Sequence, residues 1–174
     1  RQMLNRTKLD NGLTVVCERI PNVRSVAIGF WVACGSRNES ANEQGISHLI
    51  EHMLFKGTQQ RSARQIAESI DAVGGHLNAF TTKEYTSYYV KILDQHFRLG
   101  LDLLSDMVIN SIFAPEELEK EKNVVLEEVR MYEDSPDELI YDLFAQTLLK
   151  DHPLGHPILG TPESLLKLRR EDLI

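Results

Sequence analysis

Apolar residues near the start of the chain form short runs that end at turn-forming residues, as β-strands do. Two such runs between Met3 and Ile20 flank the dipeptide Asn11-Gly12, which is the strongest short-range signal for a β-hairpin. The segment 23–33 follows with β-branched and aromatic residues on both faces, as in a strand that lies deep in a sheet. The pattern therefore predicts an opening hairpin and a third, covered strand, with Trp31 in the core.

The spacing of apolar residues becomes helical after the polar loop 35–45. Within 46–54 they recur at steps of three and four, which predicts an amphipathic helix. The segment 62–73 begins with a capping box, in which a serine is followed three residues later by a glutamine, and it predicts a second helix. The period then returns to two over 76–82 and 85–93, which indicates a second hairpin.

The second half of the chain reads as helical. Leucines at helical intervals predict a helix over 94–109, and prolines at first-turn positions begin helices over 115–133 and 135–150. A short helix follows Thr161, and another begins around Glu171. Since the strands come as hairpins and the helices in groups, we expect an α+β fold with one largely antiparallel sheet covered by helices.

Composition narrows the classes of function. The chain has 174 residues, 42% of them hydrophobic, and 19 basic against 26 acidic residues give a formal charge of −7. This acidity argues against a nucleic-acid partner, and no apolar run reaches the 18 residues of a membrane span. Cys17 and Cys34 show no metal-binding or redox spacing, so we expect two small buried side chains in a reducing compartment.

The sequence His48-Leu-Ile-Glu51-His52 is the motif in this chain that most clearly indicates a metal-binding site. Two imidazoles four residues apart lie on one face of a helix, at the separation that two ligands of a tetrahedral Zn²⁺ require. Glu51 shares that face and could act as the general base of metal-assisted hydrolysis. This HxxEH order is the inverzincin signature, although a surface pair of histidines beside an acid would produce the same letters.

A catalytic zinc site needs a third protein ligand, and the acid-rich helix after Pro115 offers one. Glu121 and Glu128 share the face of that helix on which its apolar residues recur. A carboxylate on an inward face is costly unless it is paired or bound to a metal. Glu121 and Glu128 are therefore candidates for the metal site, and for Glu121 an ion pair with a nearby base is the alternative.

Three segments carry a resemblance to a known family: GISHLIEHMLFKGT, GGHLNAFTTKEYTSYY and EKEKNVVLEEVRMYEDSPDE. Over essentially its whole length the chain resembles the pitrilysin-type inverzincin metallopeptidases, and within them the β subunits of mitochondrial processing peptidase and their bacterial relatives. The resemblance implies that His48, His52 and Glu128 hold one Zn²⁺ per active site, with Glu51 as the catalytic base. It also implies that Glu121 orients a ligand.

The same resemblance implies residues that bind a peptide substrate. The strand at Asn78-Ala79-Phe80 is similar to the family's edge strand, to which an extended peptide adds by main-chain hydrogen bonds. Phe55 corresponds to a residue that lines the pocket after the scissile bond. Without the resemblance, the strand would be ordinary and Phe55 would be a core residue.

Glu138 and Asp142 lie four residues apart on a predicted helix, where two carboxylates can form a fork for a guanidinium. The matching positions of processing peptidases bind an arginine on the non-primed side of the cut. The resemblance therefore implies a preference for basic peptides, while two solvated acids on a surface helix are the alternative.

The sequence begins at Arg1 and stops within a predicted helix. We therefore expect residues 1–174 to be an incomplete N-terminal, zinc-binding catalytic domain of a longer chain. The resemblance implies a second homologous domain or subunit that completes the active chamber, and a dimer. The resemblance favours the bacterial cytoplasm and leaves the mitochondrial matrix open. The expected activity is a zinc endopeptidase that cuts extended peptides; a catalytically silent scaffold subunit and a structural zinc site are the alternatives.

Overall fold

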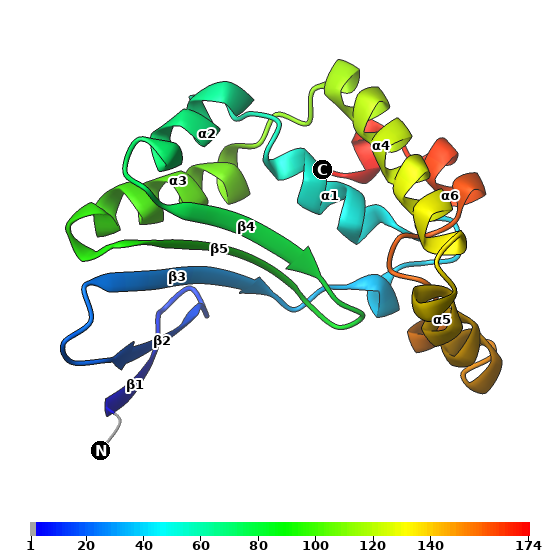
Figure 1. The fold of residues 1–174 in the computed structure, drawn as a ribbon, viewed down its shortest axis with the longest axis horizontal. Coiled ribbons are helices and arrows are strands. Elements are labelled where there is room, and N and C mark those ends of the chain that lie inside the picture. The colour runs from blue at the N-terminus through cyan, green and yellow to red at the C-terminus, as the bar shows by residue number, and fades with distance from the viewer. Residues whose placement is uncertain (1–2) are drawn as a thin grey trace.

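The computed structural model describes residues 3–174 and contains a three-stranded antiparallel sheet, a separate two-stranded hairpin and six α-helices within that range (Figure 1). The strands are β1 (Met3–Lys8), β2 (Thr14–Arg19), β3 (Ser25–Val32), β4 (His76–Thr81) and β5 (Thr86–Leu93). The α-helices are α1 (Ile46–Leu54), α2 (Ala63–Asp71), α3 (Phe97–Asn110), α4 (Pro115–Glu133), α5 (Pro136–Leu148) and α6 (Pro162–Lys167). Short 3₁₀ turns occupy Ser36–Asn38, Asp94–His96, Pro153–Gly155 and Arg170–Asp172. The predicted α+β class is confirmed.

Both predicted hairpins form. β1 pairs with β2 in antiparallel register across a turn in which Gly12 has φ 90° and the Asn11 side chain accepts a hydrogen bond from Leu13 N–H. β5 pairs with β4 on one side and with β3 on the other, so the sheet order is β3-β5-β4. β4 is therefore an edge strand of the sheet in the described part of the chain.

Helices α1, α2 and α3 lie on one face of the sheet, and α4 lies beyond α1 (Figure 1). One hydrophobic cluster fills the space between the sheet and these helices and includes Leu54, Val90 and Leu103. A second cluster joins α1 to α4 and α6 and includes Leu49 and Val125. Helix α1 thus packs on two sides, and this double packing fixes its position relative to both the sheet and α4.

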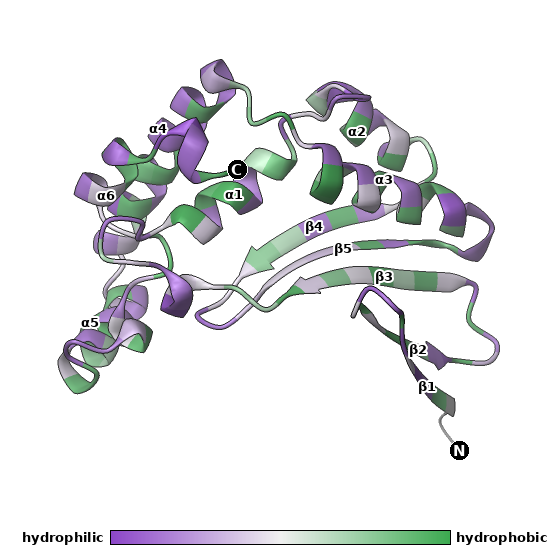
Figure 2. Cartoon of the chain, turned by 180° about the vertical axis from the view of Figure 1, so that it is seen from behind, coloured by the Kyte–Doolittle hydropathy of each residue, from purple (hydrophilic) through white to green (hydrophobic). Residues whose placement is uncertain are grey.

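Two predictions about burial are wrong. Trp31 is 66% exposed, and Cys17 and Cys34 are both exposed. Trp31 lies on β3 and Cys34 follows it; the face of this strand away from the helices has no covering element among residues 3–174, although the strand is hydrophobic along much of its length (Figure 2). Cys17 lies on β2, in the separate hairpin, where every residue of the strand is exposed. The Trp31 ring lies instead over Gly29, where a Cβ would clash with it.

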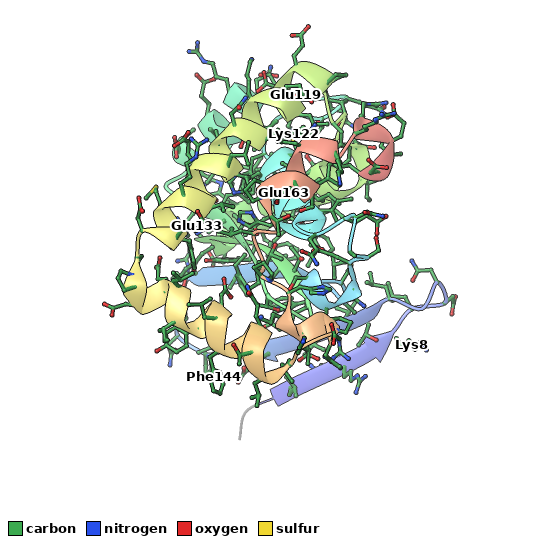
Figure 3. All side chains as sticks on the ribbon, turned by 90° about the vertical axis from the view of Figure 1, so that its right-hand side faces the viewer. Lys8, Glu119, Lys122, Glu133, Phe144 and Glu163 are labelled. Carbon is green, nitrogen blue, oxygen red and sulfur yellow. The ribbon has the colours of Figure 1, made fainter. Side chains whose placement is uncertain are left out.

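Helix α5 has no buried residue and lies at one end of the molecule (Figure 3). Its exposed apolar side chains include Tyr141 and Phe144. The sequence prediction extended this helix to about residue 150, two residues beyond its observed end, and the helix predicted near Glu171 is a single 3₁₀ turn. No helix among residues 3–174 is long and apolar enough to cross a membrane.

Candidate metal centre

The second hydrophobic cluster brings the helix of the HxxEH motif against the acidic helix α4. His48 and His52 lie on α1 with their ring centroids 4.6 Å apart, and Glu128 faces them from α4. Glu128 Oε2 lies 3.8 Å from His48 Nε2 and 3.7 Å from His52 Nε2. Among the described residues, no other group of three metal-binding side chains offers ligand atoms this close, within 4.8 Å of one another.

This donor set fits a zinc ion. Ligand atoms of a tetrahedral site with bonds of about 2.1 Å lie roughly 3.4 Å apart, close to the two distances from Glu128. Two imidazole nitrogens and one carboxylate oxygen are typical of catalytic zinc sites, which leave the fourth position for water or substrate. The side chains are buried or half-buried, at 10% exposure for His48, 23% for His52 and 39% for Glu128.

The buried state of His48 keeps its ring in the form that binds a metal. Burial, together with the smaller effect of the neighbouring His52, lowers the pKa of His48 to about 4. The imidazole is therefore neutral at neutral pH, with a lone pair available to a cation. His48 Nδ1 is buried and has no hydrogen-bond partner among the described residues.

Glu121 contacts both a histidine and a lysine. Its Oε2 lies 3.1 Å from His52 Nδ1, and its Oε1 lies 2.5 Å from Lys56 Nζ. The residue is only 5% exposed, and a carboxylate buried in this way needs partners within the protein. His52 and Lys56 supply one partner for each of its oxygens. The structure thus contains both the ion pair and the contact with a histidine that the sequence analysis weighed as alternatives.

Glu51 is held by a residue that sequence reasoning missed. Thr81 Oγ1, at the end of β4, donates a hydrogen bond of 2.6 Å to Glu51 Oε2. Burial raises the pKa of Glu51, the Thr81 hydrogen bond opposes this rise, and the net shift is upward. The signal in the sequence was the alternation along β4, which turns Thr81 to the same face as the inward Ala79.

A second missed residue, Glu39, fixes the start of α1. Its carboxylate accepts hydrogen bonds from Gly45 N–H (2.8 Å) and Ser47 N–H (2.9 Å), two groups that the helix itself leaves unpaired. Gly45 adopts φ 89°, which a residue with a Cβ rarely does. The side chain reaches the helix from outside the usual N-cap position, so no capping pattern in the sequence revealed it.

Three of the residues expected to bind substrate, Asn78, Ala79 and Phe80, lie on the edge strand β4. Ala79 N–H donates to the Asn78 side-chain oxygen (2.8 Å). Phe80 is 39% exposed and packs edge-on against Tyr85 and Tyr89. Phe55, just after α1, is half-buried and packs against the first hydrophobic cluster, which agrees with its alternative interpretation as a core residue.

Glu138 and Asp142 lie on α5 near the C-terminal end of α4. Their carboxylates form no hydrogen bond or ion pair within residues 3–174. Burial raises the pKa of the Tyr132 phenol, and so do the negative charges of three carboxylates around it. These three are Glu138, Asp142 and Glu128. The two acids of α5 and the candidate metal ligand of α4 therefore act on one tyrosine.

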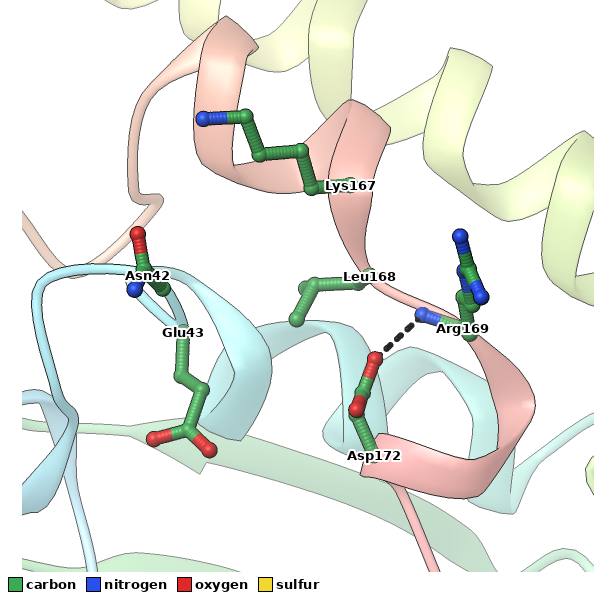
Figure 4. Close-up of a pocket in the computed structure, with 6 residues that line it drawn as sticks. All are labelled: Asn42, Glu43, Lys167, Leu168, Arg169 and Asp172. Atoms are coloured by element: carbon green, nitrogen blue, oxygen red, sulfur yellow. Dashed lines mark hydrogen bonds between the residues drawn. The ribbon is translucent and has the colours of Figure 1, made fainter.

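A surface pocket of about 340 Å³ lies elsewhere, between the loop before α1 and the segment after α6 (Figure 4). Asn42, Lys167 and Arg169 are among its lining residues, and Arg169 N–H donates to Asp172 there. None of the predicted site residues lines it. The pocket therefore has no part in the metal site.

Comparison with known proteins agrees with this geometry. Residues 14–162 match the family described as insulinase, peptidase family M16. The chain belongs to the M16 peptidase family. The resemblance expected from the sequence is thus confirmed for the family, while the processing-peptidase branch within it remains a prediction.

The M16 relatives include both proteases and an inactive domain. An uncharacterized zinc protease of Bacillus subtilis is 53% identical over 171 residues, which cover 98% of this chain and 42% of that protein. The crystal structure of a protease from Helicobacter pylori has a TM-score of 0.94 at 27% identity, covering 99% of this chain and 42% of the other. A peptidase M16 inactive domain from Pseudomonas fluorescens, at 19% identity and a TM-score of 0.91, shows the fold alone and likewise has 42% of its chain covered. The chain therefore spans about two fifths of the length of these relatives.

Proposed function

We propose that this chain supplies the zinc-binding catalytic region of a metalloendopeptidase that hydrolyses extended or unfolded peptides. The observation that carries the proposal is the meeting of His48, His52 and Glu128 from two helices, with Glu51 on the same helix as both histidines. Three ligands and an adjacent carboxylate are the arrangement of a catalytic zinc site rather than of a structural one, which is closed by four protein ligands.

Each residue of the site would contribute a separate part of hydrolysis. A bound zinc ion lowers the pKa of a coordinated water to about 7 and polarises a carbonyl oxygen. Glu51 would accept the proton of the attacking water and then deliver it to the amine nitrogen of the departing peptide. Thr81 occupies one oxygen of Glu51, which leaves the other oxygen for this proton. No covalent bond to the protein is required.

The peptide substrate would add to β4 as a further strand. β4 has β5 on one side only, and the Ala79 N–H donates to a side chain rather than to a strand, as an N–H at a free edge would. Strand addition draws its affinity from main-chain hydrogen bonds, so it tolerates many sequences but requires an extended chain. Asn78, Ala79 and Phe80 would line this edge, and Phe55 would contact the residue after the cut.

The rest of the site would come from outside residues 1–174. Among the residues assigned a role above, none is a positively charged side chain that could stabilise the oxyanion formed during hydrolysis. The relatives are more than twice as long as this chain. We propose that a second homologous domain or subunit completes the chamber, that the protein is a dimer, and that it works in the bacterial cytoplasm. The processing-peptidase branch and a preference for arginine belong to the same proposal.

A catalytically silent scaffold subunit is the second candidate, because an inactive M16 domain shares this fold. The fold alone does not decide between them. The metal ligands and Glu51 are all present here, and this favours the peptidase.

Glu51→Gln tests the proposal directly in the full-length protein. The variant should retain one zinc ion per chain but lose peptide hydrolysis by at least about 100-fold, as expected for a lost general base. The assay uses an unfolded peptide and a parallel measurement of bound zinc. Glu127→Gln is the matched control, since Glu127 pairs with Arg130 on the exposed side of α4. Full activity in Glu51→Gln would refute the mechanism.

A further inference from the structure

Lys56 is a charged residue close to the metal site for which neither the fold nor the proposed chemistry gives a role. We propose that Lys56 is a positioning residue for the metal centre, which fixes the Glu121 carboxylate so that Glu121 in turn fixes the His52 ring. The inference rests on the proposed function only in taking zinc as the metal. It predicts that Lys56 controls zinc affinity without touching the ion.

The contacts form a short chain of three side chains. Lys56 follows the end of α1, and its N–H donates to the Met53 carbonyl (3.0 Å), so it continues the helical path one turn beyond His52. Glu121 reaches both residues from α4, with Oε1 at 2.5 Å from Lys56 Nζ and Oε2 at 3.1 Å from His52 Nδ1. Each oxygen of the planar carboxylate thus has its own partner, which leaves the group little freedom to rotate.

The orientation of His52 depends on this carboxylate. A hydrogen bond at Nδ1 selects the tautomer whose Nε2 is free to bind a metal, and it fixes the plane of the ring. His52 Nε2 is the atom that lies 3.7 Å from Glu128. His48 has no such support, because its Nδ1 has no partner among the described residues. Of the two histidines, only His52 is therefore held in a fixed orientation by a hydrogen bond among the described residues, and Glu121 provides it.

Lys56 matters because Glu121 is buried. The Glu121 side chain is 7% exposed, whereas that of Lys56 is 30% exposed, so the lysine can keep part of its hydration while it holds the carboxylate. Without Lys56, one buried oxygen would lose its partner, and the carboxylate would turn toward water or toward another donor. His52 would then lose its fixed Nδ1 contact.

Charge and position make opposite predictions for this residue. A lysine ammonium repels a nearby divalent cation, so if Lys56 acted only through its charge, removing it would strengthen zinc binding. If Lys56 acts through position, removing it would weaken zinc binding even though a repulsive charge is gone. The sign of the change in zinc affinity therefore separates the two roles.

The test measures the zinc dissociation constant of the full-length protein by competition with a chromophoric chelator. Lys56→Met should weaken zinc binding about tenfold, the lower end of the effect of residues that orient metal ligands, and Lys56→Arg should restore most of the affinity. Lys120→Met is the matched control, because it removes one positive charge from an exposed pair with Glu117 on α4. That control should leave zinc affinity unchanged.

A double-mutant cycle tests whether Lys56 acts through Glu121. Glu121→Gln should itself weaken zinc binding, and adding Lys56→Met to it should cost no more than about twofold. The double variant contains no unpaired buried carboxylate, so it should fold even if Lys56→Met alone does not. Its zinc affinity can then still be compared with that of Glu121→Gln. Additive losses would overturn the proposed order of contacts.

The outcomes distinguish this inference from the proposed function. Unchanged or tighter zinc binding in Lys56→Met, with normal binding by the unaltered protein, would overturn the role of Lys56 alone. An unaltered protein that retained no zinc would overturn both proposals. Full peptide hydrolysis by Glu51→Gln would overturn the proposed function and leave the zinc affinities of the Lys56 variants as expected.

Discussion

In the proposed metal site, Glu128 would supply the third ligand, because among the described residues it is the acid of a second helix that lies closest to both histidines. Its Oε2 lies almost equally far from the two imidazoles, at 3.8 and 3.7 Å. The helix α4 places it one residue from the buried Val129 and three from Val125, so the packing of α4 sets where the carboxylate stands. A small rotation of this helix would move the ligand away.

Glu128→Gln should therefore weaken zinc binding by at least about 100-fold, since an amide oxygen is a poorer ligand than a carboxylate and the site loses its negative charge. Dialysis against a chelator followed by metal analysis measures the effect. Glu127→Gln, at the neighbouring exposed position, should keep its zinc. Unchanged zinc stoichiometry in Glu128→Gln would show that Glu128 is not a ligand.

Sequence reasoning worked for residues whose role depends on local spacing and failed for those whose role depends on a distant partner. His48 and His52 stand four apart on one helix, and that spacing alone predicts a shared ion. Thr81 and Glu39 act on α1 from other elements. The alternation along β4 indicates the face on which Thr81 lies, but nothing near either residue in the sequence identifies its partner on α1. The prediction that Trp31 is buried was wrong for the same reason, because the burial of a strand face depends on which element covers it.

At the scale of elements, a buried carboxylate on α3 accepts hydrogen bonds from the loop after α1. Asp106 is 4% exposed and accepts hydrogen bonds from Thr58 (2.7 Å), Arg61 (2.7 Å) and Asn110 (2.9 Å). This network anchors the chain where it leaves the metal-binding helix. Burial raises the pKa of the Asp106 carboxyl, but the hydrogen bonds and the Arg61 charge outweigh it and hold that pKa below its ordinary value.

Asp106 should make folding depend on pH in the acid range. Because its pKa is lower in the folded than in the unfolded state, its contribution to stability is present above the unfolded pKa of about 4 and is lost as pH falls through the lower, folded value. Urea unfolding at pH 3 to 7 measures this loss. In Asp106→Asn that part of the pH dependence should disappear.

At neutral pH, Asp106→Asn should lower the free energy of unfolding by about 1–3 kcal/mol. The reason is that the amide NH₂ group would replace one carboxylate oxygen and would then face the groups that now donate hydrogen bonds to Asp106. Asp102→Asn is the matched control. Asp102 pairs with the same Arg61, but its side chain is 61% exposed, so its loss should cost no more than about 1 kcal/mol. Equal effects of the two substitutions would contradict the proposed importance of burial.

Element types and order follow from periodicity and caps, and most boundaries agree with the structure within a few residues. The capping box at Ser62, for example, forms as predicted and begins α2. The pairing of strands was harder, because β3 lies beside β5 rather than beside its neighbour in sequence, β2. Hairpin turns predict local pairs, but long-range pairs depend on how the helices between the strands pack.

At the scale of the whole molecule, acidic residues of α5 place further negative charge on the side of the molecule where Glu128 and Tyr132 lie. Glu138 and Asp142 have no cationic partner within residues 3–174, and they add, with Glu128, to the rise that burial causes in the pKa of Tyr132. Such a cluster would attract a basic peptide. The arginine preference proposed above would then arise from two helices of the molecule that meet at residues 133–136.

In the double variant Glu138→Gln with Asp142→Asn, the preference for peptides with arginine rather than alanine on the N-terminal side of the scissile bond should fall about tenfold. The ratio of kcat/KM for the two peptides measures this. Glu163→Gln, on the exposed surface of α6, removes a negative charge elsewhere and should leave the ratio unchanged. Equal rates for both peptides in the unaltered protein would contradict the arginine site.

The metal should also stabilise the molecule, because its ligands come from two helices in different parts of the chain. A ligand that binds only the folded state adds about 2.7 kcal/mol at 100 times its dissociation constant, or roughly 5–10 °C in Tm for a domain of this size. Thermal unfolding with zinc and after chelation measures this difference. In Glu128→Gln the two melting temperatures should converge, because the variant lacks the ligand that joins α4 to α1. Zinc that stabilised this variant as strongly as the unaltered protein would have to bind elsewhere, and the connection between the two helices would then not depend on the ion.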